Sequence, residues 1–281
     1  MKTFFASIFL FIISSAYCFP PGFFDPMPAR VLDSTKLEVF YNLKFQPDTL
    51  DQSYIREETM LLLVGRNLST FSSLNRFRFD SAEIHRDQAT TQKLKADFAG
   101  TVASMPRHRT RFNFRVYKNY PAGKITTIDY ILPDNLKYAE PLRPFTWVLT
   151  EDQKDFSGYR LQKATTRYGG RSWVAWFAPE VPVSDGPYKF GGLPGLIMYM
   201  YDTRRHFVFE MKSISPKTNR KIEFPERRYI ITNRRDFLRA EEAFRRDIIT
   251  KAAAAGLDNH AQQLAAQNMR RRNNPIELRA D

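Results

Sequence analysis

The chain has 281 residues, with 43 Lys and Arg against 30 Asp and Glu, which gives a formal net charge of +13. This length is enough for one large domain, and 24 Phe, 13 Tyr and 3 Trp supply an aromatic core. The single cysteine, Cys18, excludes an internal disulfide, so packing alone must hold the fold together.

Residues 1–18 have the layout of a secretory signal peptide. Lys2 precedes an apolar run that is short for a membrane span, and small residues stand before candidate cleavage points after Ala16 and Cys18. We expect a mature N-terminus between residues 17 and 24, with an uncleaved anchor as the alternative. Export to the periplasm, the outer-membrane periphery or the medium excludes nucleic acid as a partner. The net charge then indicates solubility, or contact with an anionic envelope surface.

The segment that follows contains irregular structure and then strands. Residues 19–34 are rich in Pro and Phe and predict an irregular lead-in. Alternation in 36–45 predicts a first strand, and 58–73 predicts two strands joined by a turn at 65–67. The polar, Ala-rich stretch 80–104 predicts a surface helix capped by Asp80 or Ser81.

Strand signals return from residue 110. Residues 110–118 alternate and predict a strand, and a turn at 119–124 leads into a second strand at 125–131. The polar stretch 151–158 predicts a turn between two further strands. Gly169-Gly170 is a two-residue hairpin signal. Strands joined by short turns predict an antiparallel sheet.

The C-terminal part is helical in character. Apolar residues near helical spacing predict a helix over 234–256, with Thr232 or Asn233 as its cap and Gly256 as its end, and Phe237, Phe244 and Ile248 on its inner face. A second Ala- and Gln-rich helix is predicted within 260–269. We assign 35–256 to a single β-rich domain and 257–281 to a basic tail.

The stretch Y-K-F-G-G-L-P-G-L-I at 188–197 places three glycines and a proline directly before a strongly apolar strand. Gly191, Gly192 and Gly195 adopt positive φ freely, whereas Pro194 fixes its own φ and holds Leu193 extended. The run therefore predicts a turn that delivers Leu196 and Ile197 into a strand buried on both faces. Contact between this bare backbone and a ligand is the alternative, which we consider weaker.

Residues 170–197 as a whole resemble the signature of the GLPGLI family of exported bacterial proteins. Residues 60–71, residues 158–164 and the final N-N-P-I-E-L also resemble the family's layout, so the resemblance covers most of the mature chain. It implies an exported β-rich protein and no established activity. Leu161 stands where the family often has a cysteine, so no cysteine function carries over.

Four residues in and near the motif are candidates for ligand binding. Arg171 and Lys189 would pair with an anionic head group at the rim of a pocket, and Trp176 and Tyr188 offer stacking faces. The alternative is that core side chains fill this space completely. Asp185 is expected to cap a turn, and Glu180 to form a surface ion pair.

The sequence shows no recognised catalytic or metal-binding motif. The four histidines, at 85, 108, 206 and 260, lack metal-ligand spacing, and no nucleophile elbow or P-loop is present. We therefore expect no metal and no cofactor. A hydrolase that uses carboxylates such as Glu180, Asp185 or Asp202 stays open as an alternative.

The sequence thus predicts a mainly β (α+β) protein with a strongly curved antiparallel sheet or open half-barrel. By fold-level analogy this resembles the lipoprotein carriers of the periplasm. The favoured function is non-enzymatic binding of an apolar or amphiphilic ligand, or of an envelope partner. The alternatives are the carboxylate hydrolase and a structural adaptor at an anionic membrane surface.

Overall fold

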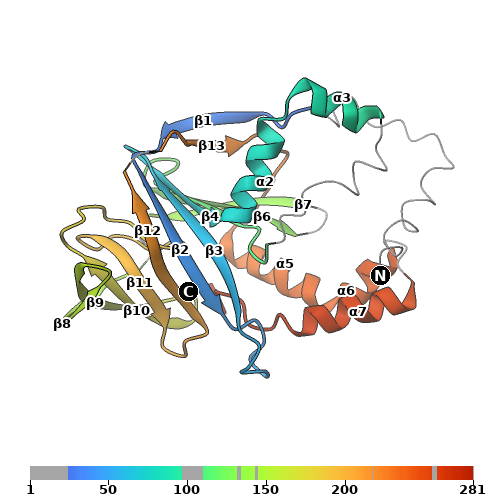
Figure 1. Ribbon diagram of the computed structural model, residues 1–281. Helices are drawn as coiled ribbons and strands as arrows, with labels where there is room; N and C mark the ends of the chain where they lie inside the picture. The colour runs from blue at the N-terminus through green and yellow to red at the C-terminus, as the bar shows by residue number, and fades with distance from the viewer. Residues whose placement is uncertain are drawn as a thin grey trace.

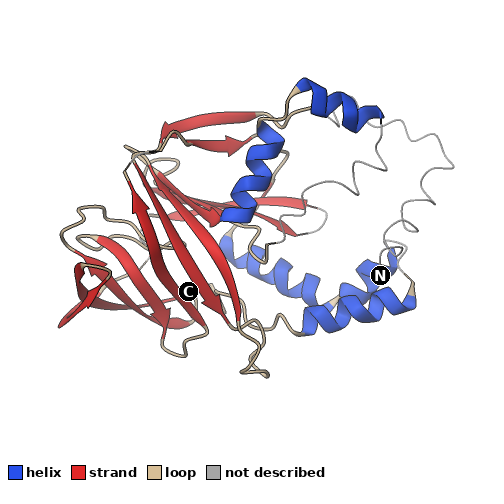
Figure 2. Ribbon diagram, viewed as in Figure 1, coloured by secondary structure: helices blue, strands red, loops and turns tan. Residues whose placement is uncertain are grey.

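The computed structural model describes most of the chain, in the ranges 25–96, 110–131, 134–142, 145–216, 218–254 and 258–280. The signal peptide predicted at 1–18 lies outside the described residues. Within them the protein is mainly β, with helices gathered along one side of a large open sheet (Figures 1 and 2). Among these helices, none has the length and apolarity that a membrane span requires.

Fourteen strands are described, and their bounds follow in chain order: β1 Ala29–Ser34, β2 Leu37–Phe45, β3 Arg56–Val64, β4 Ser69–Ser73, β5 Arg115–Lys118, β6 Lys124–Ile131, β7 Asp134–Pro141, β8 Val148–Phe156, β9 Tyr159–Tyr168, β10 Arg171–Ala178, β11 Leu196–Asp202, β12 Phe207–Ser215, β13 Lys221–Pro225 and β14 Ile230–Ile231. The helices are α2 Leu74–Ile84, α3 Gln88–Ala96, α5 Arg234–Arg246, α6 Ile248–Ala254 and α7 Asn259–Arg270.

Twelve of these strands form one sheet in the order β14-β7-β6-β5-β4-β3-β2-β12-β11-β10-β9-β8. All neighbours pair antiparallel except β14, which runs parallel to β7. Strands β1 and β13 form a separate two-stranded sheet. The large sheet is open, with β14 and β8 at its two edges.

The sheet curves so strongly that strands far apart in its order meet. Tyr168 ends β9, and its hydroxyl donates a hydrogen bond of 2.5 Å to Glu140 on β7. Strands β6, β5, β4, β3, β2, β12, β11 and β10 lie between these two strands in the hydrogen-bonded order. The sheet therefore bends back on itself without closing, as the predicted open, curved sheet requires.

The alternation of side chains explains which face of the sheet is buried. In β2, Val39, Tyr41 and Leu43 are fully buried and belong to the main core. Lys44, the residue after Leu43, points to the other face of the sheet and is exposed. Strand β3 is buried on both faces, because Leu61 and Leu63 pack into a second cluster beneath β13 and α2. This second cluster closes the outer face of the sheet at β3 to β6.

Several predicted boundaries are wrong. The helix predicted at 80–104 is two helices: α2 begins at Leu74, directly after β4, with the hydroxyl of Ser73 accepting the backbone N–H groups of Asn75 and Arg76. Asp80 therefore lies inside α2 and does not cap it. Helix α3 covers residues 88–96. Residues 97–104 of the predicted helix lie outside the described residues.

Two other polar or Pro-rich stretches form strands. Residues 29–34 of the predicted irregular lead-in pair with β13 as β1. Most of the predicted turn at 151–158 belongs to β8, and the turn itself shrinks to Ser157 and Gly158, both at positive φ. In each case pairing with a neighbouring strand overrides the local polar composition.

The C-terminal helices also differ from prediction. Asn233 caps α5 as predicted, since its side-chain oxygen accepts the N–H of Asp236 at 2.9 Å. The predicted single helix breaks at Asp247 into α5 and α6, and Ile248 lies in the second of these. Helix α7 covers the predicted Ala- and Gln-rich segment, so residues 259–270 of the predicted basic tail are helical.

The motif stretch forms a loop, residues 179–195, which we call the motif loop. Gly192 and Gly195 have φ of 89° and 156°, as the predicted turn requires. At Gly195 an added Cβ would lie 2.2 Å from the carbonyl oxygen of Ala178, so the close approach excludes any side chain. The loop delivers Leu196 and Ile197 into β11, where both are fully buried.

We expect Gly195→Ala to lower the free energy of unfolding by about 1–3 kcal/mol or more, because the new methyl group collides with the backbone at Ala178 in a strained conformation. Gly158→Ala is the matched control. Gly158 has φ of 83° and nothing within 4 Å of its Cβ position. The free energy of unfolding of this variant should therefore fall by only about 1 kcal/mol, from the strained backbone conformation alone. Urea unfolding of both variants measures the difference, and equal losses would contradict the close approach.

Candidate functional site

The motif loop fills the interior of the curved sheet. Phe190 is fully buried, and its ring centroid lies 5.0 Å from that of Trp173, 5.3 Å from Phe145 and 5.7 Å from Tyr168. Aromatic rings at these separations pack as a continuous core. The space around Phe190 is therefore occupied by side chains, which was the alternative to a pocket at this place.

Lys118 of β5 fixes the loop from the opposite side of the curve. Its buried ammonium group donates to the carbonyl oxygens of Gly186 at 2.6 Å and Phe190 at 2.8 Å, and it pairs with Asp185. Burial lowers the pKa of Lys118, while the charge of Asp185 opposes that change. Asp185 also accepts the N–H of Gly186 at 2.7 Å, so it caps its turn as predicted.

Lys189, predicted at a rim, is fully buried instead. Its Nζ lies 2.8 Å from a carboxylate oxygen of Glu140 on β7 and 2.7 Å from one of Glu277 near the C-terminus. It also donates to the hydroxyl groups of Tyr138 and Tyr168. Burial disfavours its charge, but Glu277 and the surrounding tyrosine side chains together outweigh this and raise the pKa of Lys189 well above its usual value.

Arg171 is buried too, so it does not stand at a rim either. Its guanidinium group pairs with Asp202 at 3.1 Å and donates to the carbonyl oxygen of Ile276 at 3.0 Å and that of Pro275 at 2.6 Å. Both predicted head-group cations thus bind parts of the protein itself. The sequence did not predict their burial because their partners lie far away along the chain, in β7, β11 and the C-terminal segment.

The other two predicted binding residues lie apart from each other. Tyr188 is buried at φ 54° and donates a hydrogen bond of 2.5 Å to Glu277. Trp176 is half-buried on β10, and the ammonium group of Lys154 lies 4.5 Å from the centroid of its ring. The structure therefore brings Tyr188, Lys189 and Glu277 together and leaves Trp176 outside this group.

The three carboxylates considered for hydrolysis do not converge. Asp185 pairs with Lys118 and Asp202 with Arg171. Glu180 accepts the backbone N–H of Arg160 at 2.9 Å, in place of the predicted surface ion pair. Each of them has a structural partner of its own.

A cleft of about 320 Å³ opens above the Lys189 network, between the sheet and the C-terminal helices. Its floor includes Tyr138, Tyr188 and Glu277, and residues 274–277 form part of its wall. The rest of the wall is largely apolar and comes from β2, β6, β12, α5, α7 and the residues before β5: Phe45, Phe112, Phe114, Ile131, Phe207, Phe237, Leu238, Phe244 and Met269. Phe237 and Phe244 of α5 face this space as predicted, and the ring centroid of Phe237 lies 5.1 Å from that of Tyr138 in a tilted arrangement.

Two arginines border the cleft without a carboxylate partner among the described residues. The guanidinium group of Arg111 donates to the hydroxyl of Tyr54 at 2.9 Å. The pKa of Arg272 is lowered, first by burial and then by the charge of Arg111. Both arginines line the same cleft, and the charge of Arg111 disfavours that of Arg272. An anion placed between them would remove that repulsion.

The cleft also contains two acids and an unpaired hydroxyl. Burial raises the pKa of Asp129 on β6 to about 7, and the charge of Glu241 on α5 adds to the effect. The pKa of Glu241 is itself raised, again mainly by burial. The buried hydroxyl of Thr127 has no hydrogen-bond partner among the described residues. Unpaired polar groups in a cleft indicate a place for a ligand's polar atoms.

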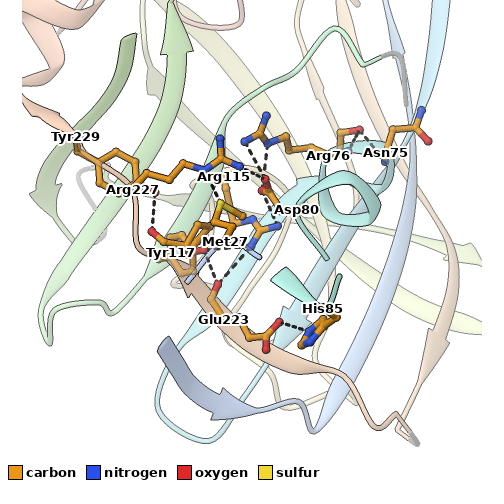
Figure 3. A network of polar contacts seen from close by, with 12 residues as sticks. Met27, Asn75, Arg76, Asp80, His85, Arg115, Tyr117, Glu223, Arg227 and Tyr229 are labelled. Carbon is orange, nitrogen blue, oxygen red and sulfur yellow. Dashed lines mark hydrogen bonds and ion pairs between the residues drawn. The ribbon is translucent and has the colours of Figure 1, made fainter. Parts of the chain in front are cut away.

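A second polar cluster anchors α2 (Figure 3). The fully buried carboxylate of Asp80 receives Arg76 from the same helix, Arg115 from β5 and Arg227 from the segment before β14, at 2.9, 3.0 and 3.1 Å. Three elements are tied to one carboxylate. We attribute a structural role to this cluster, because all its bonds join parts of the fold.

Sequence reasoning missed the cleft residues Arg111, Asp129, Glu241 and Arg272. Asp129 is the one carboxylate in the strand K-I-T-T-I-D-Y-I, which was the only local signal. The others stand in charged stretches that look like ordinary surface. In the described part of the chain, no group of three or more His, Cys, Asp or Glu side chains is placed to hold a metal ion.

Comparisons with known proteins bear on the motif. The model of a family described as "Protein of unknown function (Porph_ging)" matches residues 169–199. The predicted resemblance to the GLPGLI family is confirmed over these residues. A comparison with curated proteins gives no match.

Two solved structures are similar to the chain. They are described as PNGF-II in the P21 and C2 space groups, with 11% and 14% sequence identity and TM-scores of 0.48 and 0.46. Both cover 74% of this chain, which spans about a third of their own length, 33% and 32%.

We expect Lys189→Met to lower the free energy of unfolding by about 3–5 kcal/mol, because it leaves two buried carboxylates without their shared cation. Lys212→Met is the matched control, since Lys212 pairs with Glu210 on the surface and should contribute less than about 1 kcal/mol. Chemical denaturation of both variants measures the losses. A Lys189→Met protein as stable as the control would show that the network carries little free energy.

The raised pKa of Asp129 predicts a pH dependence of stability. The folded state holds this proton up to about pH 7, whereas the unfolded carboxyl loses it near 3.8, so stability falls as the pH rises between these values and is level above them. Asp129→Asn should therefore gain stability relative to wild type on going from pH 5 to pH 8. Asp134→Asn, at the exposed start of β7, is the control. A difference from wild type that is constant with pH for both variants would contradict the shift.

Proposed function

We propose that this protein binds an amphiphilic molecule, with an apolar body and an anionic head, in the cleft between the sheet and helices α5 and α7. The neighbouring pair Arg111 and Arg272 in an aromatic wall is the observation that carries this proposal. A carboxylate or phosphate head offsets the repulsion between the two guanidinium groups and accepts their hydrogen bonds. The Phe side chains of the wall bury the apolar body.

The polar groups elsewhere in the cleft support a ligand with more than one polar feature. The hydroxyl of Thr127 has no partner in the part of the chain that the structure describes, and Asp129 holds a proton up to about pH 7, so both offer hydrogen bonds to a neutral group. The volume of about 320 Å³ suits a small or medium-sized molecule. A chain with a charged head and a neutral polar group nearer its middle matches these features.

Export to the cell envelope belongs to the same proposal. It rests on the apolar run after Lys2 and on the resemblance of 170–197 to an exported family. The likeness to lipoprotein carriers stays a prediction of the same kind. The net charge of +13 is compatible with work close to an anionic membrane surface, which keeps the adaptor hypothesis as an alternative.

The test is a titration of the purified protein with a fluorescent long-chain fatty acid and with the matching fatty alcohol. We expect saturable binding of both, with the acid bound more tightly. Arg272→Gln should weaken binding of the acid by about tenfold and leave the alcohol unchanged, since it removes a charge-assisted contact. Arg270→Gln, an exposed neighbour on α7, is the control, and Trp176→Ala should also be silent because Trp176 lies outside the cleft.

No saturable binding, or equal effects of Arg272→Gln and Arg270→Gln, would contradict the proposal.

A second candidate function is hydrolysis, which is favoured by the coupled acids Asp129 and Glu241 in one cleft, one of them protonated near neutral pH. The same titration with the ester of the fatty acid separates the two functions. Release of free acid that disappears in Asp129→Asn would support hydrolysis, and binding without release would support the carrier.

A further inference from the structure

Residues 273–279, near the C-terminus, form an irregular segment that follows α7, which we call the strap. It returns to the β9–β10 turn, where the N–H of Leu278 donates to the carbonyl oxygen of Gly169 at 2.7 Å. Some of its polar partners, Gly169, Arg171, Tyr188 and Lys189, lie within residues 169–199, the stretch that the family model matches. Others are Arg234 of α5 and residues 46–49, which follow β2. The motif therefore supplies part of the surface on which the strap lies.

Arg171 recognises the backbone of the strap. Its guanidinium group donates to the side-chain oxygen of Asn274 at 2.6 Å and to the carbonyl oxygens of Pro275 at 2.6 Å and Ile276 at 3.0 Å. Three acceptors on three consecutive residues are bound by one planar group. This arrangement fixes the position of these three residues relative to Arg171.

Glu277 gives the strap its side-chain specificity. Its carboxylate is buried and receives Lys189 at 2.7 Å, Arg234 at 2.5 Å and the hydroxyl of Tyr188 at 2.5 Å. Burial raises the pKa of Glu277, but the charges of Lys189 and Arg234 outweigh this and lower it, so the group is ionised. A neutral residue at this position would lose all three charge-assisted bonds.

The β9–β10 turn allows the strap to approach closely. A Cβ on Gly169 would lie 3.3 Å from the Cα of Glu277, and one on Gly170 would lie 3.1 Å from the Cβ of Leu278. Both glycines also have positive φ, as the two-residue hairpin requires. The Gly-Gly turn thus serves the hairpin and the docking of the strap together.

The groove keeps its charge balance without the strap. Lys189 retains Glu140 at 2.8 Å, and Arg171 retains Asp202 at 3.1 Å. Each buried cation has a carboxylate supplied by the sheet itself, so departure of Glu277 leaves neither of them uncompensated. Only Arg234, at the start of α5, loses its carboxylate. A structural seal of the core would have no need of this second set of counter-ions.

We propose that the motif forms a peptide-recognition groove for the sequence Asn-Pro-apolar-Glu, and that the strap is its releasable ligand. Because residues 274–277 also line the cleft, release of the strap opens one wall of it. This consequence for ligand entry rests on the proposed function, whereas peptide recognition does not.

The first experiment is hydrogen exchange on the unmodified full chain. The amides of Asn274 and Leu278, which bond to Pro47 and Gly169, should exchange through a local opening that responds little to low denaturant. Amides of β2 and β3 should exchange only with global unfolding. Strap amides that follow the core in rate and in denaturant dependence would overturn the proposal.

The second experiment uses full-length Glu277→Lys, in which repulsion by Lys189 and Arg234 displaces the strap. A labelled peptide of residues 272–280 should bind this variant at least about tenfold more tightly than it binds Glu242→Lys, a charge reversal on the exposed face of α5. The same peptide with its own Glu277→Lys change should not bind. Equal binding to both proteins would overturn the proposal, and if Glu277→Lys fails to fold, the exchange experiment decides.

Neither experiment uses the amphiphile. A protein that binds the peptide and no fatty acid would therefore separate failure of the proposed function from failure of the groove.

Discussion

The ammonium group of Lys189 is buried, and a buried charge must be neutralised close by. Its two carboxylates come from β7 and from the C-terminal segment, whereas Lys189 itself belongs to the motif loop. One ion-pair network thus ties together three parts of the chain that are far apart in sequence. The curvature of the sheet follows from the same demand, because β7 and β9 must both reach the network.

The cleft depends on this network for its floor. Tyr138 and Tyr188 turn their hydroxyl groups down to Lys189 and Glu277, and their rings are left to line the space above. The charges of Lys189, Glu140 and Glu277 therefore neutralise one another below the cleft. Arg111 and Arg272, which the proposed function assigns to the head group of a ligand, come from segments outside the motif. The motif therefore shapes the cleft and supplies neither of these arginines.

The sequence was informative where structure is local. The Gly-Gly hairpin, the positive φ of Gly192 and Gly195, the Asn233 cap and the burial of Leu196 and Ile197 all follow from backbone chemistry within a few residues. It failed where partners are distant. The residues next to Lys189 in the sequence give no sign that Glu140 and Glu277 are its partners. Lys189 was therefore predicted at the rim of a pocket, whereas it is buried. The start of α2 was missed because β4 runs into it without a linker, and Asp80 looked like a cap when it is a buried anchor.

The open sheet leaves two edges, and each is unsuited to adding another strand. Strand β14 is only two residues long, and β8 carries a bulge between Leu149 and Gln153 together with the acids Glu151, Asp152 and Asp155. Short, bulged or charged edges do not template a neighbouring chain. A protein this rich in aromatic strands would otherwise be prone to polymerise edge to edge. The short edge strand β14 and the bulged, acidic edge strand β8 therefore disfavour that kind of polymerisation.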